Sequence, residues 1–358
     1  MAQQHLDPTD PTAQAVPVSG DALAGYLRAQ ATEFLRSLRL HRETGGGGGT
    51  PARASSSVGE NGSDRSVDAA RALRRSARRI SGSLHTYRPL LDPDWSEGMR
   101  PELAWLSGTL AREHAYSARL ERLLGALNRL SGSGSGFPAQ AAGPGASAAP
   151  KGNLTIGAAK AGALLDRQLT LARTRAHSAA LQALGSSRFH AVADSVAVLA
   201  SEVPLTPAAA TADLRPPAAA AEGRLLDAVA ALPLLTAGHP YNAEALVHGL
   251  SADTAPQPQD APWHQVRLLL RLHRYAREVL YGEECPVDVR LLGAGQALNQ
   301  HRDAAEAASA AASAARTPRI APATAYALGV LHADQRHEVE AARFAFQQSW
   351  QKEAVPTL

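Results

Sequence analysis

The sequence predicts an all-α protein, and two observations support this prediction. Alanine, leucine and arginine favour helices, and alanine supplies 75 of the 358 residues while arginine supplies 33. Isoleucine and the aromatic residues favour strands, but the chain has three isoleucines and only 4% aromatic residues. No segment alternates apolar and polar residues as a half-buried strand does, so we expect about nine or ten helices.

Apolar residues at helical spacing locate these helices along the chain. The first begins near Asp21, where Leu23, Leu27 and Phe34 recur on one side. Prolines interrupt the next helical region, because proline lacks the amide hydrogen that a helix interior needs. The expected helices are residues 21–42, 67–130 with interruptions at Pro89, Pro93 and Pro101, 154–203 with a break at 185–187, 222–236, 263–281, 287–315 and 321–352.

Segments rich in glycine, serine, proline and alanine separate the helices. The first of them opens with five consecutive glycines, residues 45–49. Such segments bury too little apolar surface to offset the entropy that is lost when a chain becomes ordered. We expect a disordered tail at residues 1–18 and flexible inserts near residues 44–66, 131–152 and 204–220.

Composition and motifs exclude several functional classes. The single cysteine, Cys285, cannot support a disulfide framework or a multi-cysteine metal site. No apolar run reaches the roughly 18 residues of a membrane span, and the first ten residues do not resemble a signal peptide. Phosphate-loop, zinc-protease and nucleophile-elbow motifs are absent. We therefore expect a cytoplasmic protein that is not an enzyme, with no catalytic residue, metal site, cofactor or membrane partner.

A stripe of arginines marks the helix expected at residues 67–88. The stretch from residue 71 to residue 88 contains six arginines and no acid. At 100° per residue, the arginines within residues 71–79 occupy about 140° of arc, and Leu73, Ala77, Ile80 and Leu84 lie opposite them. This helix therefore has a basic side and an apolar side. The basic side carries Arg71, Arg74, Arg75, Arg78 and Arg79.

A second stripe occupies the helix expected at residues 263–281. It consists of His264, Arg267, Arg271 and Arg274, which lie within about 80° of arc. The spacing of the first stripe recurs here, since Arg71, Arg74 and Arg78 correspond to His264, Arg267 and Arg271, 193 residues further along. We therefore expect a pseudo-repeat in which two basic helices face a common groove.

Solvated helix surfaces are the simplest alternative explanation of both stripes, since the whole protein is rich in arginine. The lack of acids within residues 71–88 and 264–277 argues against it, because exposed helices usually pair opposite charges three or four positions apart. Like charges at this spacing repel by about 0.2–0.5 kcal/mol per pair. A bound anion would neutralise them.

These residues resemble the signatures of the conserved histidine α-helical domain (CHAD) family. The second-lobe signature, His-x2-Arg-x3-Lys/Arg-x2-Arg-Tyr-x2-Glu, is matched in full from His264 to Glu278. The Arg-Asp pair that follows in the family is similar to Arg302-Asp303. The first lobe departs from its signature, because Arg71 stands in place of the histidine and Ser81 in place of an arginine. His114-Ala115 stands where the first-lobe Arg-Asp pair is expected.

The resemblance implies an antiparallel helical bundle over residues 19–355. Its two pseudo-symmetric lobes would span about residues 19–203 and 221–355 and enclose a central basic cleft. Members of the family bind inorganic polyphosphate, and some associate with polyphosphate granules. For this chain, the resemblance implies a polyphosphate site formed by Arg71, Arg74, Arg78, Arg79, His264, Arg267, Arg271 and Arg274.

Two other functions stay open at this point. A nucleic-acid partner is the weaker one, because binders of single strands stack bases on aromatic residues and residues 71–79 contain none. The other is a scaffold or partner-binding protein that has lost its affinity for anions, which the altered first lobe would explain. His264 could titrate near neutral pH at the anion, or it could be a packing residue between the lobes.

Overall fold

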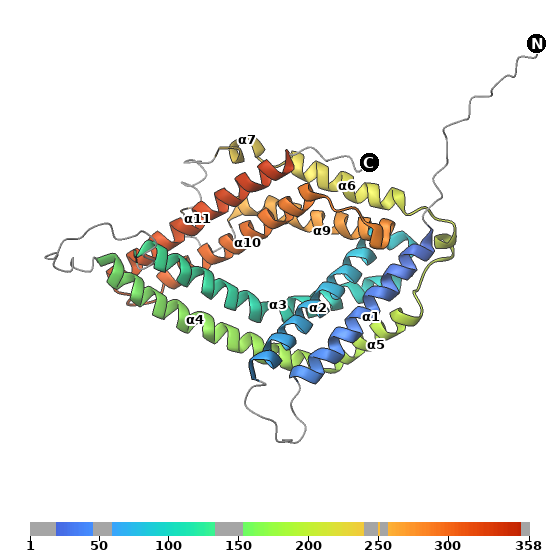
Figure 1. Cartoon of the computed structure of the whole chain (residues 1–358), viewed down its shortest axis with the longest axis horizontal. Coiled ribbons are helices and arrows are strands. Elements are labelled where there is room, and N and C mark those ends of the chain that lie inside the picture. Colours follow the sequence, from blue (N-terminus) through green and yellow to red (C-terminus); the bar gives the residue numbers. More distant parts are fainter. Residues whose placement is uncertain (1–18, 46–58, 133–152, 240–249, 251–256, 352–358) are drawn as a thin grey trace, which may run out of the picture.

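The computed structural model describes residues 19–45, 59–132, 153–239, 250 and 257–351. These residues form ten α-helices and four short 3-10 helices and contain no strand, which confirms the predicted all-α class (Figure 1). The α-helices are α1 (Gly20–Gly45), α2 (Gly59–Thr86), α3 (Pro93–Leu130), α4 (Asn153–Leu184), α5 (Ser187–Ser201), α6 (Arg215–Ala230), α7 (Leu234–Ala237), α9 (Ala261–Tyr281), α10 (Val289–Ala315) and α11 (Pro322–Trp350).

Capping residues explain several helix boundaries. The side chain of Asp92 accepts a hydrogen bond from the amide of Trp95 (2.8 Å), and Pro93 occupies the first position of α3. Ser186 caps α5 in the same way, because its hydroxyl accepts from the amide of Phe189 (3.2 Å). Such side chains bind amides that have no partner inside the helix. The expected break at residues 185–187 is confirmed.

Three expected boundaries need correction. α2 begins at Gly59 and α6 at Arg215, so each helix starts inside a segment that we expected to be an insert. Pro101 does not interrupt α3 but lies inside it. It is exposed there, and the turns around it are held by the buried Leu103 and Leu106. The expected tail at residues 1–18 and most of the insert near 131–152 lie outside the described residues.

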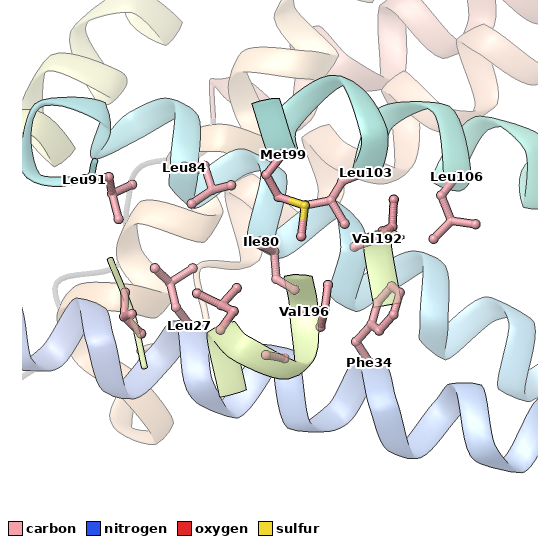
Figure 2. Close-up of a cluster of buried hydrophobic side chains, with 14 of the residues drawn as sticks. Leu27, Phe34, Ile80, Leu84, Leu91, Met99, Leu103, Leu106, Val192 and Val196 are labelled. Carbon is pink, nitrogen blue, oxygen red and sulfur yellow. The ribbon is translucent and has the colours of Figure 1, made fainter. Parts of the chain in front are cut away.

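The buried apolar residues form three clusters. The first joins α1, α2, α5, the beginning of α3 and the end of α9, and it includes Phe34, Ile80, Leu103 and Val196 (Figure 2). The second joins α6, α9, α10 and the end of α11 around Trp263. The third joins the end of α3 and α4 with α10 and α11. This third cluster combines helices from both expected lobes, and the pseudo-symmetry of the lobes stays a prediction.

α2 and α9 approach each other closely at Gly82. A Cβ atom at this position would lie 2.6 Å from Cδ2 of Tyr275 and 3.3 Å from Cδ2 of Leu272. Nearby, the hydroxyl of Tyr87 donates a hydrogen bond to the carbonyl oxygen of Ala276 (3.2 Å). The absence of a side chain at Gly82 therefore lets the two arginine-bearing helices pack side by side.

We predict that Gly82→Ala destabilises the protein, although alanine is the better helix former. The new methyl group would overlap the ring of Tyr275, and overpacking of this kind costs about 1–3 kcal/mol. Gly108→Ala on α3 is the matched control, because a Cβ there meets no atom within 4 Å and should stabilise by about 0.5–1 kcal/mol. Urea unfolding of both variants measures the difference, and equal stability gains would contradict the close approach.

Candidate functional site

The apolar sides of α2 and α9 fix the direction in which their arginines point. Leu73, Ile80 and Leu84 of α2 are fully buried in the first cluster. Val266 and Leu269 of α9 are buried in the second cluster. The apolar side of α2 is the one that the sequence predicted. Because the apolar sides of both helices face the cores, the basic sides are directed away from the cores.

Five guanidinium groups from three helices lie close enough to influence one another. We call them the central arginine cluster: Arg74 and Arg78 of α2, Arg267 and Arg271 of α9, and Arg302 of α10. Burial, together with the charges of Arg78, Arg302 and Arg71, lowers the pKa of Arg74 to about 10. Burial and the charges of Arg302, Arg271 and Arg78 lower the pKa of Arg267 to about 9.

The same effects act on Arg271. Burial lowers the pKa of its guanidinium, and the charges of Arg78 and Arg302 lower it further while Tyr275 opposes them. A lowered pKa means that the cationic form is less stable here than in water. A bound anion would stabilise the cationic form.

The cluster contains hydrogen-bond donors without acceptors. The Nε atoms of Arg74, Arg78 and Arg271 are buried and have no hydrogen-bond partner among the described residues. None of these three side chains forms an ion pair with an acid in that part of the chain. An unsatisfied buried donor costs about 1–3 kcal/mol. These three Nε donors therefore lack an acceptor among the described protein residues.

The other two members of the cluster are held by polar neighbours. Nε of Arg267 donates to Oδ1 of Asn299 on α10 (2.8 Å). Nε of Arg302 donates to Oδ1 of Asp303 (2.9 Å). The Arg302-Asp303 pair was noticed in the sequence only through the family resemblance. Its place beside the two stripes depends on the packing of α10 against α9, which no local pattern reveals.

Arg71 and Arg79 of the first predicted stripe have partners of their own. A terminal nitrogen of Arg71 lies 3.2 Å from a carboxylate oxygen of Asp68, one turn earlier on α2, and the other lies 3.4 Å from His114. Arg79 forms a two-pronged ion pair with Glu278 of α9 (2.7 and 3.2 Å). The acids that are missing from the stripe itself are thus supplied from outside it.

Arg274 of the second stripe faces a different part of the surface. It lines a pocket of about 220 Å³ together with Arg277, Glu278 and Asp288. Of the eight predicted site residues, the structure therefore brings together Arg74, Arg78, Arg267 and Arg271 in the central arginine cluster. Arg274 is not a member of this cluster.

His264 stands at the edge of the cluster and is half-buried. Its ring meets that of His301 edge to face, with 5.4 Å between the ring centres. Burial lowers the pKa of His264, and the charges of Arg267 and Arg302 add to this effect while Asp260 and Glu306 oppose it. The imidazole is therefore mostly neutral at pH 7 in the protein without a ligand.

A buried ion-pair network lies behind His264. Asp260, immediately before α9, accepts hydrogen bonds from both terminal nitrogens of Arg336 (2.8 and 3.1 Å) and from Arg343 (2.6 Å). Burial alone would raise the pKa of Asp260, but hydrogen bonds with His301 and Arg336 hold it well below its usual range. The network ties the start of α9 to α10 and α11. No local pattern in the sequence indicates it, because Arg336 and Arg343 lie 76 and 83 residues from Asp260.

Two pockets adjoin the central arginine cluster. The α3–α10 pocket has a volume of about 410 Å³, and Arg74 and Arg302 lie in its wall. The α3–α9 pocket has a volume of about 320 Å³, and Arg78 and Arg271 lie in its wall. Arg74 and Arg78 are one helical turn apart on α2, so the two pockets are neighbours. α3 adds Arg112, Arg119 and Arg122 to the wall of the α3–α10 pocket and Arg100 to the wall of the α3–α9 pocket. None of these four arginines belongs to the site that the sequence predicted.

Within the described residues, no three His, Cys, Asp or Glu side chains are grouped so that they could hold a metal ion. No helix in the same part of the chain combines the length and the apolar character that a membrane span requires.

A family model for the CHAD domain matches residues 57–312, which is more than two thirds of the chain. The chain belongs to the CHAD-domain family. A solved structure described as PptA from Streptomyces chartreusis is 70% identical to this CHAD protein, and the match covers 94% of this chain and 100% of that one with a TM-score of 0.75. A comparison with curated proteins finds no match.

The matched CHAD region includes both stripes and the lining of both pockets but leaves out two helices that support them. α1 precedes it and supplies Tyr26, whose hydroxyl donates to the carboxylate of Glu278 (2.8 Å). α11 follows it and supplies Arg336 and Arg343 to Asp260. The flanking helices therefore fix the position of α9, which carries the better matched half of the family signature.

We predict that Asp260→Asn lowers the free energy of unfolding by about 3–5 kcal/mol. Loss of one partner from a buried ion-pair network leaves a remaining charge without compensation, here that of Arg336, while Arg343 keeps only its pair with Glu340. Glu33→Gln removes an exposed carboxylate that pairs with Arg36 and should cost less than about 1 kcal/mol. Chemical denaturation of both variants tests this prediction, and similar small losses would show that the network is not important for stability.

Proposed function

We propose that this protein binds inorganic polyphosphate through the central arginine cluster and does not alter it chemically. The observation that carries the proposal is the convergence of three buried Nε donors without partners, from Arg74, Arg78 and Arg271. Guanidinium groups offer planar arrays of donors that match phosphate oxygens and stay charged at neutral pH. Membership of the CHAD family supports the same ligand.

A linear polyanion fits the site better than a small anion does. The cluster draws guanidinium groups from α2, α9 and α10 and continues into two pockets. A chain with one negative charge per internal phosphate can contact several of these groups at once. Each contact releases counterions and relieves repulsion between neighbouring arginines.

The predicted site residues then divide into two groups. Arg74, Arg78, Arg267 and Arg271 would contact the polyphosphate chain, and His264 would join them when it is protonated. Arg71, Arg79 and Arg274 would add to the positive potential around the site. Through such binding the protein would collect at polyphosphate granules in the cytoplasm.

We predict that binding weakens steeply as salt increases. By analogy with single-stranded nucleic acid, each neutralised phosphate contributes about −0.7 to the slope of log K against log salt. Exchange of both Arg267 and Arg271 for glutamine should reduce the magnitude of this slope by roughly one to one and a half, because two phosphate contacts are lost. Titrations with long-chain polyphosphate at several salt concentrations measure it.

The control for this experiment removes the same charge elsewhere. Arg28→Gln combined with Arg175→Gln changes two exposed arginines that lie outside both stripes and line neither pocket, and the slope should hardly change. Single-stranded DNA serves as a competitor. Displacement of polyphosphate by DNA at equal phosphate concentration would favour nucleic-acid binding, and the absence of binding to either polyanion would favour a scaffold without anion affinity.

We predict that polyphosphate binds more tightly as the pH falls from 8 to 6. The pKa of His264 is lowered in the free protein, whereas a bound anion favours the imidazolium and raises this pKa. Binding therefore takes up a proton, and proton uptake strengthens binding at lower pH. His264→Gln should flatten this dependence in part, because His85 and His114 also line the pockets. Identical pH profiles of the variant and the wild-type protein would exclude this role for His264.

A further inference from the structure

The α3–α10 pocket differs from the α3–α9 pocket in its acids. Asp303 and Glu306 of α10 lie in the wall of the α3–α10 pocket. Among the described residues that line the α3–α9 pocket there is no carboxylate. A polyanion can therefore pass through the α3–α9 pocket without meeting a negative charge. Further along, beyond Arg74 and Arg302, it would meet the two carboxylates of Asp303 and Glu306 in the α3–α10 pocket.

Ion pairs leave two positive charges in the α3–α10 pocket without a partner. Arg119 pairs with Glu306, and Arg302 pairs with Asp303. Arg122 donates to Gln335 and lies 3.5 Å from Glu338. Arg74 and Arg112 also line the pocket, and neither has an acidic partner in the described part of the chain.

The ion pair between Arg119 and Glu306 joins α3 and α10 in the wall of the α3–α10 pocket. The ring of Tyr116 packs against the guanidinium of Arg119, with 5.5 Å between Cζ of Arg119 and the ring centre. A polyphosphate chain that enters past Arg74 therefore reaches a part of the wall where the charge of Arg119 is already neutralised by the carboxylate of Glu306.

We propose that the α3–α10 pocket binds the terminal phosphate of a polyphosphate chain, and that Arg112 and Arg74 are its ligands. This inference rests on the proposed function and gives the bound chain a direction. The chain runs from the α3–α9 pocket across the central arginine cluster and ends beside Arg112.

The charge of a terminal phosphate fits this pocket better than that of an internal one. An end group has three non-bridging oxygens and, like a phosphate monoester, carries a charge between about −1.5 and −2 at pH 7. An internal phosphate carries one charge on two such oxygens. Two arginines without partners match the end group in charge and supply donors for its additional oxygen. A phosphate beyond it would face Arg119 and Arg302, whose charges are already paired with Glu306 and Asp303.

The experiment compares short polyphosphate chains of one defined length in two forms. One form has unmodified ends, and in the other form both ends are capped as phosphoramidates of a neutral amine, which removes one charge from each end. Binding of both forms is measured for the wild-type protein, Arg112→Gln, Arg271→Gln and the control Arg175→Gln. Arg175 is exposed on α4 and lines neither pocket.

For the wild-type protein, capping should weaken binding about tenfold, as expected for the loss of one charge-assisted contact. Arg112→Gln should bind the unmodified chain about tenfold more weakly and should no longer distinguish the two forms. Arg271→Gln should weaken the binding of both forms and still distinguish them, since Arg271 lies in the other pocket. Arg175→Gln should resemble the wild-type protein. Such coupling between a chain end and one residue is what a double-mutant cycle detects.

Two outcomes would overturn the inference while the proposed function survives. One is that capping has no effect on the wild-type protein, and the other is that Arg112→Gln loses the same affinity for both forms. If the wild-type protein binds neither form, the proposed function itself fails. Inorganic phosphate and ATP serve as competitors. Either competitor is added at the same concentration as the chain ends. If it then displaces the chain, the pocket recognises any terminal phosphate rather than the end of a polymer.

Discussion

Repulsion between like charges in the central arginine cluster is the constraint to which the rest of the structure responds. Two unit charges 8 Å apart repel each other by about 2 kcal/mol at an effective dielectric constant of 20. The packing behind them supplies the opposing free energy, since each fully buried side chain such as Leu73 or Val266 contributes about 1.5–3 kcal/mol. α2 is anchored in the first apolar cluster, whereas α9 is anchored mainly in the second and, through Ala276 and Val279, also in the first. Neither helix can turn its arginines away from the other without exposing its own apolar side.

The parts of the fold that depend on neighbours in the sequence could be predicted from it. Apolar residues recur at helical spacing on each helix: Leu73 and Ile80 on α2, and Val266 and Leu269 on α9. The apolar and basic sides of both helices therefore follow from local pattern alone. Pairings between distant residues could not be predicted, because arginines that look equivalent in a stripe obtain different partners. Arg79 meets Glu278, which lies 199 residues away, whereas Arg78 meets no acid in the described part of the chain.

The candidate site also has a third side, formed by α3, that the repeated stripes do not indicate. α3 runs past both pockets and supplies Arg112 and Arg119 to one of them and Arg100 to the other. The signal of an amphipathic helix is weaker here, because α3 contacts the first cluster near its beginning and the third cluster near its end. Its buried side changes along its length, and its arginines form no single stripe. Only the packing of α3 against α2 and α10 makes them part of one surface.

Arginine rather than lysine is the residue that this environment requires. Burial and neighbouring charges lower the pKa of Arg267 from its ordinary value of 12.5 to about 9. The same lowering in a lysine, whose ordinary pKa is about 10.4, would bring its pKa to about 7. A lysine at this position would therefore lose much of its charge at neutral pH, and the repulsion would be relieved by deprotonation. Arginine remains charged, so the repulsion persists until an anion binds. In the proposed function this repulsion would become part of the affinity, because an anion that enters the cluster would release it.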